Sequence, residues 1–162
     1  HDIGKIGIAD HILLKPSGFT PPEWEVMKGY AAMGAKILGN SKSRYLNMGA
    51  EIALNHHERW DGAGYPYGLR GEYIPSPARI LAIADVFDSI ASRTKSWDSA
   101  LRTLRASAGS QFDPTFCLTF FELLHNHDLQ RAHHVSTVAN TPLYSEQAAE
   151  PSANAHMTPS SI

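Results

Sequence analysis

Two adjacent histidines, His56 and His57, stand where an apolar helical pattern ends and a loop rich in glycine, proline and aromatic residues begins. Imidazole is the commonest side-chain ligand of metal ions, and such a loop composition is typical of binding segments. A histidine pair alone is weak evidence, because neighbouring helix positions diverge by about 100°. We interpret the stretch as a metal site with a substrate loop attached, and this interpretation depends on further candidate ligands elsewhere in the chain.

Three such candidates occur elsewhere in the chain: His1 and Asp2 at its start, and Asp85 in an apolar helix. An imidazole beside a carboxylate suits a divalent cation, and a carboxylate has two oxygens with which it can bridge two ions. Asp85 falls within an apolar stripe, where an unpaired carboxylate costs several kcal/mol and a cation removes the problem. A lysine or arginine partner would offset the burial cost of this carboxylate equally well, and this alternative stays open.

The composition indicates one globular domain with a real core, because 43% of the 162 residues are apolar. The net charge of -2 gives no sign of a nucleic-acid polymer or a membrane surface as partner. The single cysteine, Cys117, excludes an internal disulfide and is typical of a reducing cytoplasm. No apolar run approaches the roughly 18 residues that span a bilayer. The chain begins at His1 in mid-motif without a methionine, so we expect a fragment of a longer protein.

The spacing of apolar residues predicts an all-α fold. A helix of about 18 residues should follow the N-cap Thr20, with Trp24, Met27, Ala31, Gly34 and Leu38 on its buried face. A second helix leads into the histidine pair, and further helices are predicted near residues 78–92, 98–106 and 114–125. Apolar periodicity vanishes after that point, so residues 127–162 are predicted to form a disordered tail and residues 1–126 the domain.

The loop between Arg59 and Pro77 contains too many glycines and prolines for a long helix or strand. Glycines let backbone N–H groups approach a phosphate. The rings of Trp60, Tyr65 and Tyr67 could stack on a purine or simply pack the loop down, and packing is the expected role of Trp60.

Four segments resemble, in order and spacing, the HD-GYP family of metal-dependent phosphohydrolases. They are the run His1-Asp2-Ile3-Gly4-Lys5-Ile6-Gly7, the His56-His57 pair, the loop Trp60-Asp61-Gly62-Ala63-Gly64-Tyr65-Pro66 and the run Ala84-Asp85-Val86-Phe87-Asp88. The resemblance implies a helical bundle of the HD superfamily with an irregular glycine-rich loop. It also implies two or three divalent metal ions, iron or manganese, and hydrolysis of the bacterial messenger cyclic di-GMP to pGpG or GMP.

The resemblance assigns a role to each candidate residue. The metal ligands would be His1, Asp2, His56, His57 and Asp85, with Asp2 bridging two ions. A metal-activated hydroxide would attack phosphorus in line, while Lys5 neutralises charge on the phosphoryl oxygens. The residues that would bind substrate are Lys5, Asp61, Gly62, Gly64, Tyr65, Pro66, Arg93 and Lys95.

Two departures from the family pattern leave a second hypothesis open. Tyr30 stands where the family has a metal-binding histidine, and a phenol is a poorer ligand than imidazole at neutral pH because its ordinary pKa is about 10. The segment Arg93-Thr94-Lys95 replaces a longer basic connection. The sequence is therefore also compatible with a degenerate module that binds cyclic di-GMP, or a signalling partner through the Gly62–Pro66 loop, without catalysis.

Overall fold

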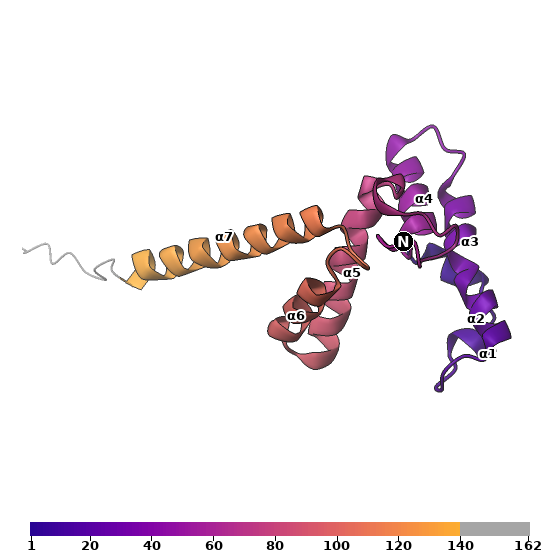
Figure 1. Cartoon of the computed structure of the whole chain (residues 1–162), viewed down its shortest axis with the longest axis horizontal. Coiled ribbons are helices and arrows are strands. Elements are labelled where there is room, and N and C mark those ends of the chain that lie inside the picture. The colour runs from indigo at the N-terminus through magenta and orange to yellow at the C-terminus, as the bar shows by residue number, and fades with distance from the viewer. Residues whose placement is uncertain (140–162) are drawn as a thin grey trace, which may run out of the picture. The chain divides into compact units, whose positions relative to one another are not determined.

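The computed structural model describes the backbone of residues 1–139 and the side chains of residues 1–126. This part of the chain is helical and contains no strand, which confirms the all-α prediction (Figure 1). The elements are η1 (Ile3–Gly7), α1 (Asp10–Leu13), α2 (Pro21–Lys28), α3 (Tyr30–Leu38), α4 (Arg44–Asn55), η2 (Gly71–Tyr73), α5 (Ser76–Thr94), α6 (Trp97–Ser107) and α7 (Pro114–Ala139).

The helix predicted after Thr20 forms two helices, α2 and α3, that meet at Gly29. Glu23 closes a capping box at the start of α2, where its carboxylate accepts the Thr20 N–H at 2.7 Å. The Gly29 N–H bonds to the Val26 carbonyl at 3.1 Å, three residues back, which tightens the last turn of α2. The break lets α3 turn its Tyr30 end toward the interior while α2 stays at the edge.

The core consists of two clusters of buried side chains. One lies around α1 and α3, and the other joins α5, α6 and the first turns of α7. Helix α3 packs on η1 and on α4, and α4 also contacts α5 (Figure 1). The first cluster contains Ile8, Ile12 and Tyr30, and the second contains Ile83, Leu104, Phe112 and Cys117.

Two residues that the periodicity placed on buried faces are exposed. Trp24 is 42% exposed, and Ile80, which belongs to an apolar stripe of the helix predicted near residues 78–92, is 54% exposed. Helix α2 buries none of its residues, because it borders the first cluster from outside. The 3.6-residue pattern predicted helical structure correctly at these two positions and their buried side wrongly.

Helix α7 continues to Ala139, beyond the end predicted at residue 125. The contacts divide the chain into two units, His1–Leu124 and His125–Ile162, and the candidate site lies wholly in the first. Residues 127–139, which the sequence analysis assigned to a disordered tail, continue helix α7 past the last apolar positions. The rest of that prediction, 140–162, lies outside the described residues.

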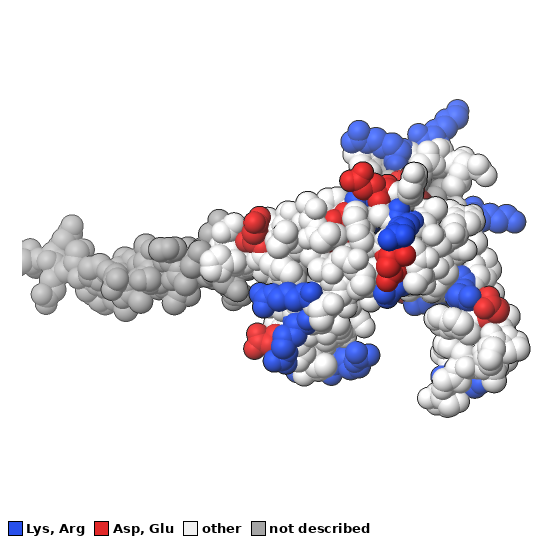
Figure 2. Space-filling model, viewed as in Figure 1, with Lys and Arg blue, Asp and Glu red and all other residues white. Residues whose placement is uncertain are grey.

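The surface carries charges of both signs. On the face drawn in Figure 2, basic and acidic side chains are interspersed over the helices of the described part, in keeping with a net charge of -2. Within residues 1–139, no helix has both the length and the apolar character needed to cross a membrane.

Candidate metal centre

The candidate ligands, far apart in the sequence, converge around the N-terminus. His1 Nε2 lies 3.6 Å from Asp85 Oδ1 of α5 and 3.7 Å from Asp2 Oδ2. The His1 ring also packs against that of His56, at the end of α4, with their centroids 5.1 Å apart. The contacts of α4 with both α3 and α5 bring these groups together.

The carboxylate of Asp85 is less buried than its apolar stripe suggested. Its side chain is 39% exposed, and its carboxylate lies 3.6 Å from Nε2 of His1. A carboxylate with that access to water does not need a cation to offset burial. The argument from burial cost is therefore wrong, and the case for Asp85 as a ligand depends on its contact with His1.

Tyr30 connects the two histidines of the pair. Its buried hydroxyl lies 2.9 Å from His56 Nε2 and 2.5 Å from His57 Nε2. His56 Nδ1 faces the carbonyl oxygens of Ile52 and Ala53 at 3.1 and 3.0 Å, so Nδ1 carries the proton and Nε2 accepts. A hydroxyl donates only one hydrogen, so it donates to His56 Nε2 and accepts from His57 Nε2–H. The three side chains form a directed hydrogen-bond relay.

The electrostatics of the relay favour neutral groups. Burial is the main reason that the pKa of His56 lies below its ordinary value. Burial together with the neighbouring His56 ring lowers the pKa of His57 to about 4. Burial, with the Asp2 carboxylate, raises the pKa of Tyr30 well above the ordinary phenol value. All three groups are therefore uncharged at neutral pH, as the relay requires.

Asp2 and Lys5 form a second pair beside the relay. Lys5 Nζ donates to Asp2 Oδ2 at 2.6 Å and also lies 5.1 Å from the centroid of the Tyr30 ring. Burial alone would raise the pKa of Asp2, but the hydrogen bond and charge of Lys5 outweigh it and lower the pKa. Gly4 lets this segment lie flat on α3, because a Cβ there would overlap the backbone of Tyr30 and Gly34.

These residues have the donor types that a divalent cation takes. His56 is oriented as metal-binding histidines commonly are, with one ring nitrogen bonded to backbone carbonyls and the other facing the site. The donor atoms are paired with protein groups, however: Asp2 with Lys5, and both Nε2 atoms with Tyr30. Among the described residues, no three His, Cys, Asp or Glu side chains are arranged to hold an ion. The residues therefore fit a metal by chemical type, and binding requires Lys5 and Tyr30 to release the donor atoms.

Glu58 fixes the glycine-rich loop next to the histidine pair. Its side chain is 4% exposed, and its two oxygens accept the N–H groups of Tyr67 and Leu69 at 2.7 and 2.9 Å. Gly64 lies directly on the backbone that precedes the loop, where a Cβ would overlap Glu58 and Arg59. The loop is irregular, as predicted, and is folded back on the end of α4.

The other side of the loop is anchored on the connection between α6 and α7. The backbone N–H of Asp61 donates to the Ser110 carbonyl at 2.8 Å, and that of Trp60 donates to the Gln111 carbonyl at 3.1 Å. The Asp61 carboxylate is occupied within the loop by Arg59, at 2.7 Å. Asp61 therefore braces the loop in this structure.

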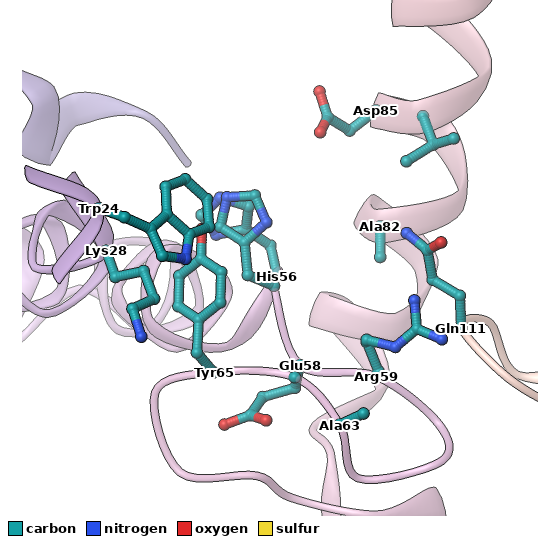
Figure 3. Close-up of a pocket in the computed structure, with 13 residues that line it drawn as sticks. Trp24, Lys28, His56, Glu58, Arg59, Ala63, Tyr65, Ala82, Asp85 and Gln111 are labelled. Atoms are coloured by element: carbon teal, nitrogen blue, oxygen red, sulfur yellow. The ribbon is translucent and has the colours of Figure 1, made fainter. Parts of the chain in front are cut away.

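A cavity of about 490 Å³ opens beside the histidine pair (Figure 3). Of the predicted substrate residues, Gly64 and Tyr65 line it, whereas Lys5, Asp61, Gly62, Pro66, Arg93 and Lys95 do not. Arg93 and Lys95 are exposed near the end of α5, roughly 12 Å or more along that helix from Asp85. The lining residues are Trp24, Lys28, His56, His57, Glu58, Arg59, Ala63, Gly64, Tyr65, Ala82, Asp85, Val86 and Gln111.

Among the residues that line the cavity, the sequence analysis did not predict a site role for Trp24, Lys28, Glu58 or Gln111. Trp24 and Lys28 are four residues apart and so share one side of α2, a signal that the sequence contains. Glu58 directly follows the histidine pair, but nothing in its sequence context distinguishes a loop anchor from a surface acid. Gln111 reaches the cavity only through tertiary packing.

Comparison with known proteins shows the family of this chain. The HD domain family matches residues 1–116. The chain is 48% identical to a cyclic di-GMP phosphodiesterase of Thermotoga maritima, over 76% of this chain and 35% of the relative. It is 50% identical to the cyclic di-GMP phosphodiesterase response regulator RpfG of Xanthomonas campestris, over 70% of this chain and 32% of that protein. The chain thus spans about a third of the length of these curated relatives.

A solved structure supports the fold. The crystal structure of a cyclic GMP-AMP specific phosphodiesterase of Vibrio cholerae, V-cGAP3, matches with a TM-score of 0.55 and 24% sequence identity. The match covers 76% of this chain and 33% of that one. At this identity the likeness concerns the arrangement of helices alone.

Proposed function

The chain belongs to the HD domain family, of the HD-GYP type, and from this premise we propose that it hydrolyses cyclic di-GMP to pGpG or GMP. The observation that carries the proposal is the contact of His1 with both His56 and Asp85, two residues that line one cavity. Both curated relatives described above are cyclic di-GMP phosphodiesterases, which supports the choice of substrate. We place this activity in the cytoplasm.

Phosphohydrolases of the HD domain family depend on metal ions. We propose two or three ions, iron or manganese, held by His1, Asp2, His56, His57 and Asp85. Bound there, divalent ions would provide an activated water and neutralise charge on the phosphate. Soft sulfur ligands play no part, since the single cysteine, Cys117, lies in the core cluster of α5, α6 and α7.

Lys5 would act on the phosphate directly. In the structure its ammonium group is held at 2.6 Å by Asp2, beside the Tyr30 ring. A phosphodiester that enters next to Asp2 offers Lys5 negatively charged oxygens, and charge-assisted hydrogen bonds to them are about twice as strong as neutral ones. Lys5 would then neutralise the phosphoryl oxygens and release Asp2.

Before metal binds, the relay of Tyr30, His56 and His57 would hold the imidazole rings in fixed orientations. The backbone carbonyls of α4 keep the proton of His56 on Nδ1, so its Nε2 stays a lone-pair donor toward the site. The His57 ring lines the cavity and stacks on Tyr65, with 4.7 Å between centroids. Tyr65 and Gly64 would thus border the substrate, while Asp61, Gly62 and Pro66 shape the loop that carries them.

The proposal is tested by incubating the 162-residue chain with cyclic di-GMP and added Mn²⁺ or Fe²⁺, and separating the products by chromatography. We expect pGpG or GMP to appear only with metal, and to disappear in Asp2→Asn. Cyclic GMP-AMP serves as the comparison substrate, because one structural relative is specific for it. No product from either nucleotide with either metal would overturn the proposal.

The same assay, together with a measurement of cyclic di-GMP binding, tests the alternative, a module that binds without catalysis. Tyr30 is the feature on which that alternative depends, since its hydroxyl occupies both Nε2 atoms. Tight binding of cyclic di-GMP without turnover would favour it. A signalling partner protein that docks on the Gly62–Pro66 loop belongs to that second function.

A further inference from the structure

We propose that Trp24 and Lys28 of α2, with Tyr65 of the glycine-rich loop, form the wall that binds one guanine nucleotide of the cyclic dinucleotide. The inference rests on the proposed function and extends it to substrate recognition. Neither Trp24 nor Lys28 belongs to the motifs that identify the family. Their placement in the cavity is a property of the folded chain.

The three side chains surround one corner of the cavity (Figure 3). The Trp24 indole meets the Tyr65 ring edge-on, with 5.9 Å between centroids, and Lys28 Nζ lies 5.9 Å from the centroid of Tyr65. Asp85 and Ala82 of α5 stand on the opposite side, as Figure 3 shows. An aromatic surface beside an ammonium group is suited to a base and its phosphate.

Trp24 has more apolar surface in contact with solvent than a packing residue requires. It is 42% exposed, although α2 has an interior side against the first core cluster. Phe19 stacks against the indole, with 6.0 Å between centroids and an interplanar angle of 22°. This contact supports one side of the ring and orients it, and aromatic surface at the edge of a cavity is typical of ligand sites.

The wall is continuous with the reacting groups. Tyr65 stacks on His57, with an interplanar angle of 23°, and His56, His57 and Asp85 line the same cavity. A volume of about 490 Å³ lies within the range of small-molecule sites and suits one nucleotide unit better than two. A guanine on this wall would bring its phosphate toward the histidine pair.

Lys28 supplies the positive charge at this corner. Its ammonium group pairs with Glu25 at 2.8 Å, but the Glu25 side chain is 71% exposed, and such surface pairs are weak. A nucleotide phosphate can therefore displace Glu25. The attraction acts across solvent and should weaken with added salt.

The test measures binding of a phosphorothioate analogue of cyclic di-GMP to the 162-residue chain by calorimetry, with Mn²⁺ and separately with EDTA. We expect Trp24→Leu to weaken binding about tenfold or more, as loss of one base–aromatic stack does. Lys28→Met should weaken it severalfold and flatten its salt dependence. The matched controls are Trp97→Leu, on exposed α6 residue Trp97, and Lys36→Met on α3, and both should bind as the unaltered chain does.

The possible outcomes distinguish failure of this inference from failure of the proposed function. If the unaltered chain binds and Trp24→Leu and Lys28→Met bind equally well with unchanged salt dependence, the wall is wrong while the proposed function stands. If the unaltered chain binds the analogue in neither condition, the proposed function fails and the wall with it. If Trp24→Leu melts at a lower temperature than the unaltered chain, its weaker binding could reflect lost stability. Trp24→Phe, which keeps an aromatic ring, is then measured in its place. The salt dependence of binding by Lys28→Met tests the wall independently.

Discussion

The hydroxyl of Tyr30 lies 2.5 Å from Nε2 of His57. Tyr30, which the resemblance places where the family has a metal-binding histidine, is thus in direct contact with a candidate metal ligand. The same hydroxyl also reaches His56, so a single phenol occupies the inward nitrogen of both imidazoles. Metal binding at this site therefore depends on whether the Tyr30 hydroxyl releases the Nε2 atoms of His56 and His57.

Replacing Tyr30 should change the metal content. Tyr30→His exchanges the phenol for an imidazole, and we expect the purified variant to retain more manganese or iron per chain when measured by mass spectrometry. Tyr45→His is the matched control, because Tyr45 is 69% exposed on α4 and pairs with Arg44. Equal metal content in Tyr30→His and the unaltered chain would show that the phenol does not limit binding.

Removing the carboxylate of Glu58 should loosen the loop. Glu58→Ala leaves the N–H groups of Tyr67 and Leu69 without acceptors, which costs about 1 to 3 kcal/mol for each group that stays buried. Hydrogen exchange should accelerate across residues 62–70 in Glu58→Ala. The exchange rates in Glu58→Gln should fall between those of Glu58→Ala and those of the unaltered chain. Glu72→Ala, at an exposed position of η2, should leave exchange unchanged. Unchanged exchange in Glu58→Ala would mean that the loop is held by its backbone contacts alone.

A methyl group at Gly64 should be poorly tolerated. The Cβ of Gly64→Ala would overlap the backbone of Glu58 and Arg59, and overpacking of this kind costs about 1 to 3 kcal/mol. Gly18→Ala meets open space and should change the free energy of unfolding by less than about 0.5 kcal/mol. Denaturant unfolding compares the two variants, and equal free energies would contradict the packing described here.

Acid should weaken the start of α2 through Glu23. The hydrogen bond from Lys15 and those from Thr20 lower the pKa of Glu23 to about 2, from 4.5. Because the folded pKa is the lower one, the stabilisation is complete above pH 4.5 and is lost as pH falls toward 2. The melting temperature should therefore fall less between pH 5 and pH 3 in Glu23→Gln than in the unaltered chain. Glu25→Gln, on the same helix, is the control and should follow the unaltered chain.

The candidate ligands could be proposed from the sequence because they stand in local motifs. His1, Asp2 and the histidine pair stand out by residue type and position, and the helices that bring them together follow from apolar spacing. The burial of Asp85 could not be predicted, since its stripe implied a covered side chain and the structure leaves 39% of it exposed. Burial depends on the neighbouring elements, which periodicity along one helix does not contain.

Fewer of the predicted substrate residues than of the candidate ligands line the cavity. Arg93 and Lys95 have the right charge for phosphate but stand on exposed turns away from the cavity. Trp24 was assigned to the buried face of one long helix, because nothing local revealed that the chain breaks at Gly29. That break decides which way the indole points, and so decides its proposed role.

The central claim is that distant imidazoles and carboxylates converge to bind metal. It is tested most directly by the metal content of Asp85→Asn beside that of the unaltered chain and of Asp88→Asn. Asp88 is exposed, lies one turn further along α5 and borders a different hollow, so it controls for the loss of one charge. We predict at least one equivalent of manganese or iron in the unaltered chain and in Asp88→Asn, and a clear loss in Asp85→Asn. Equal metal content in all three, or less than one equivalent in the unaltered chain, would contradict the claim.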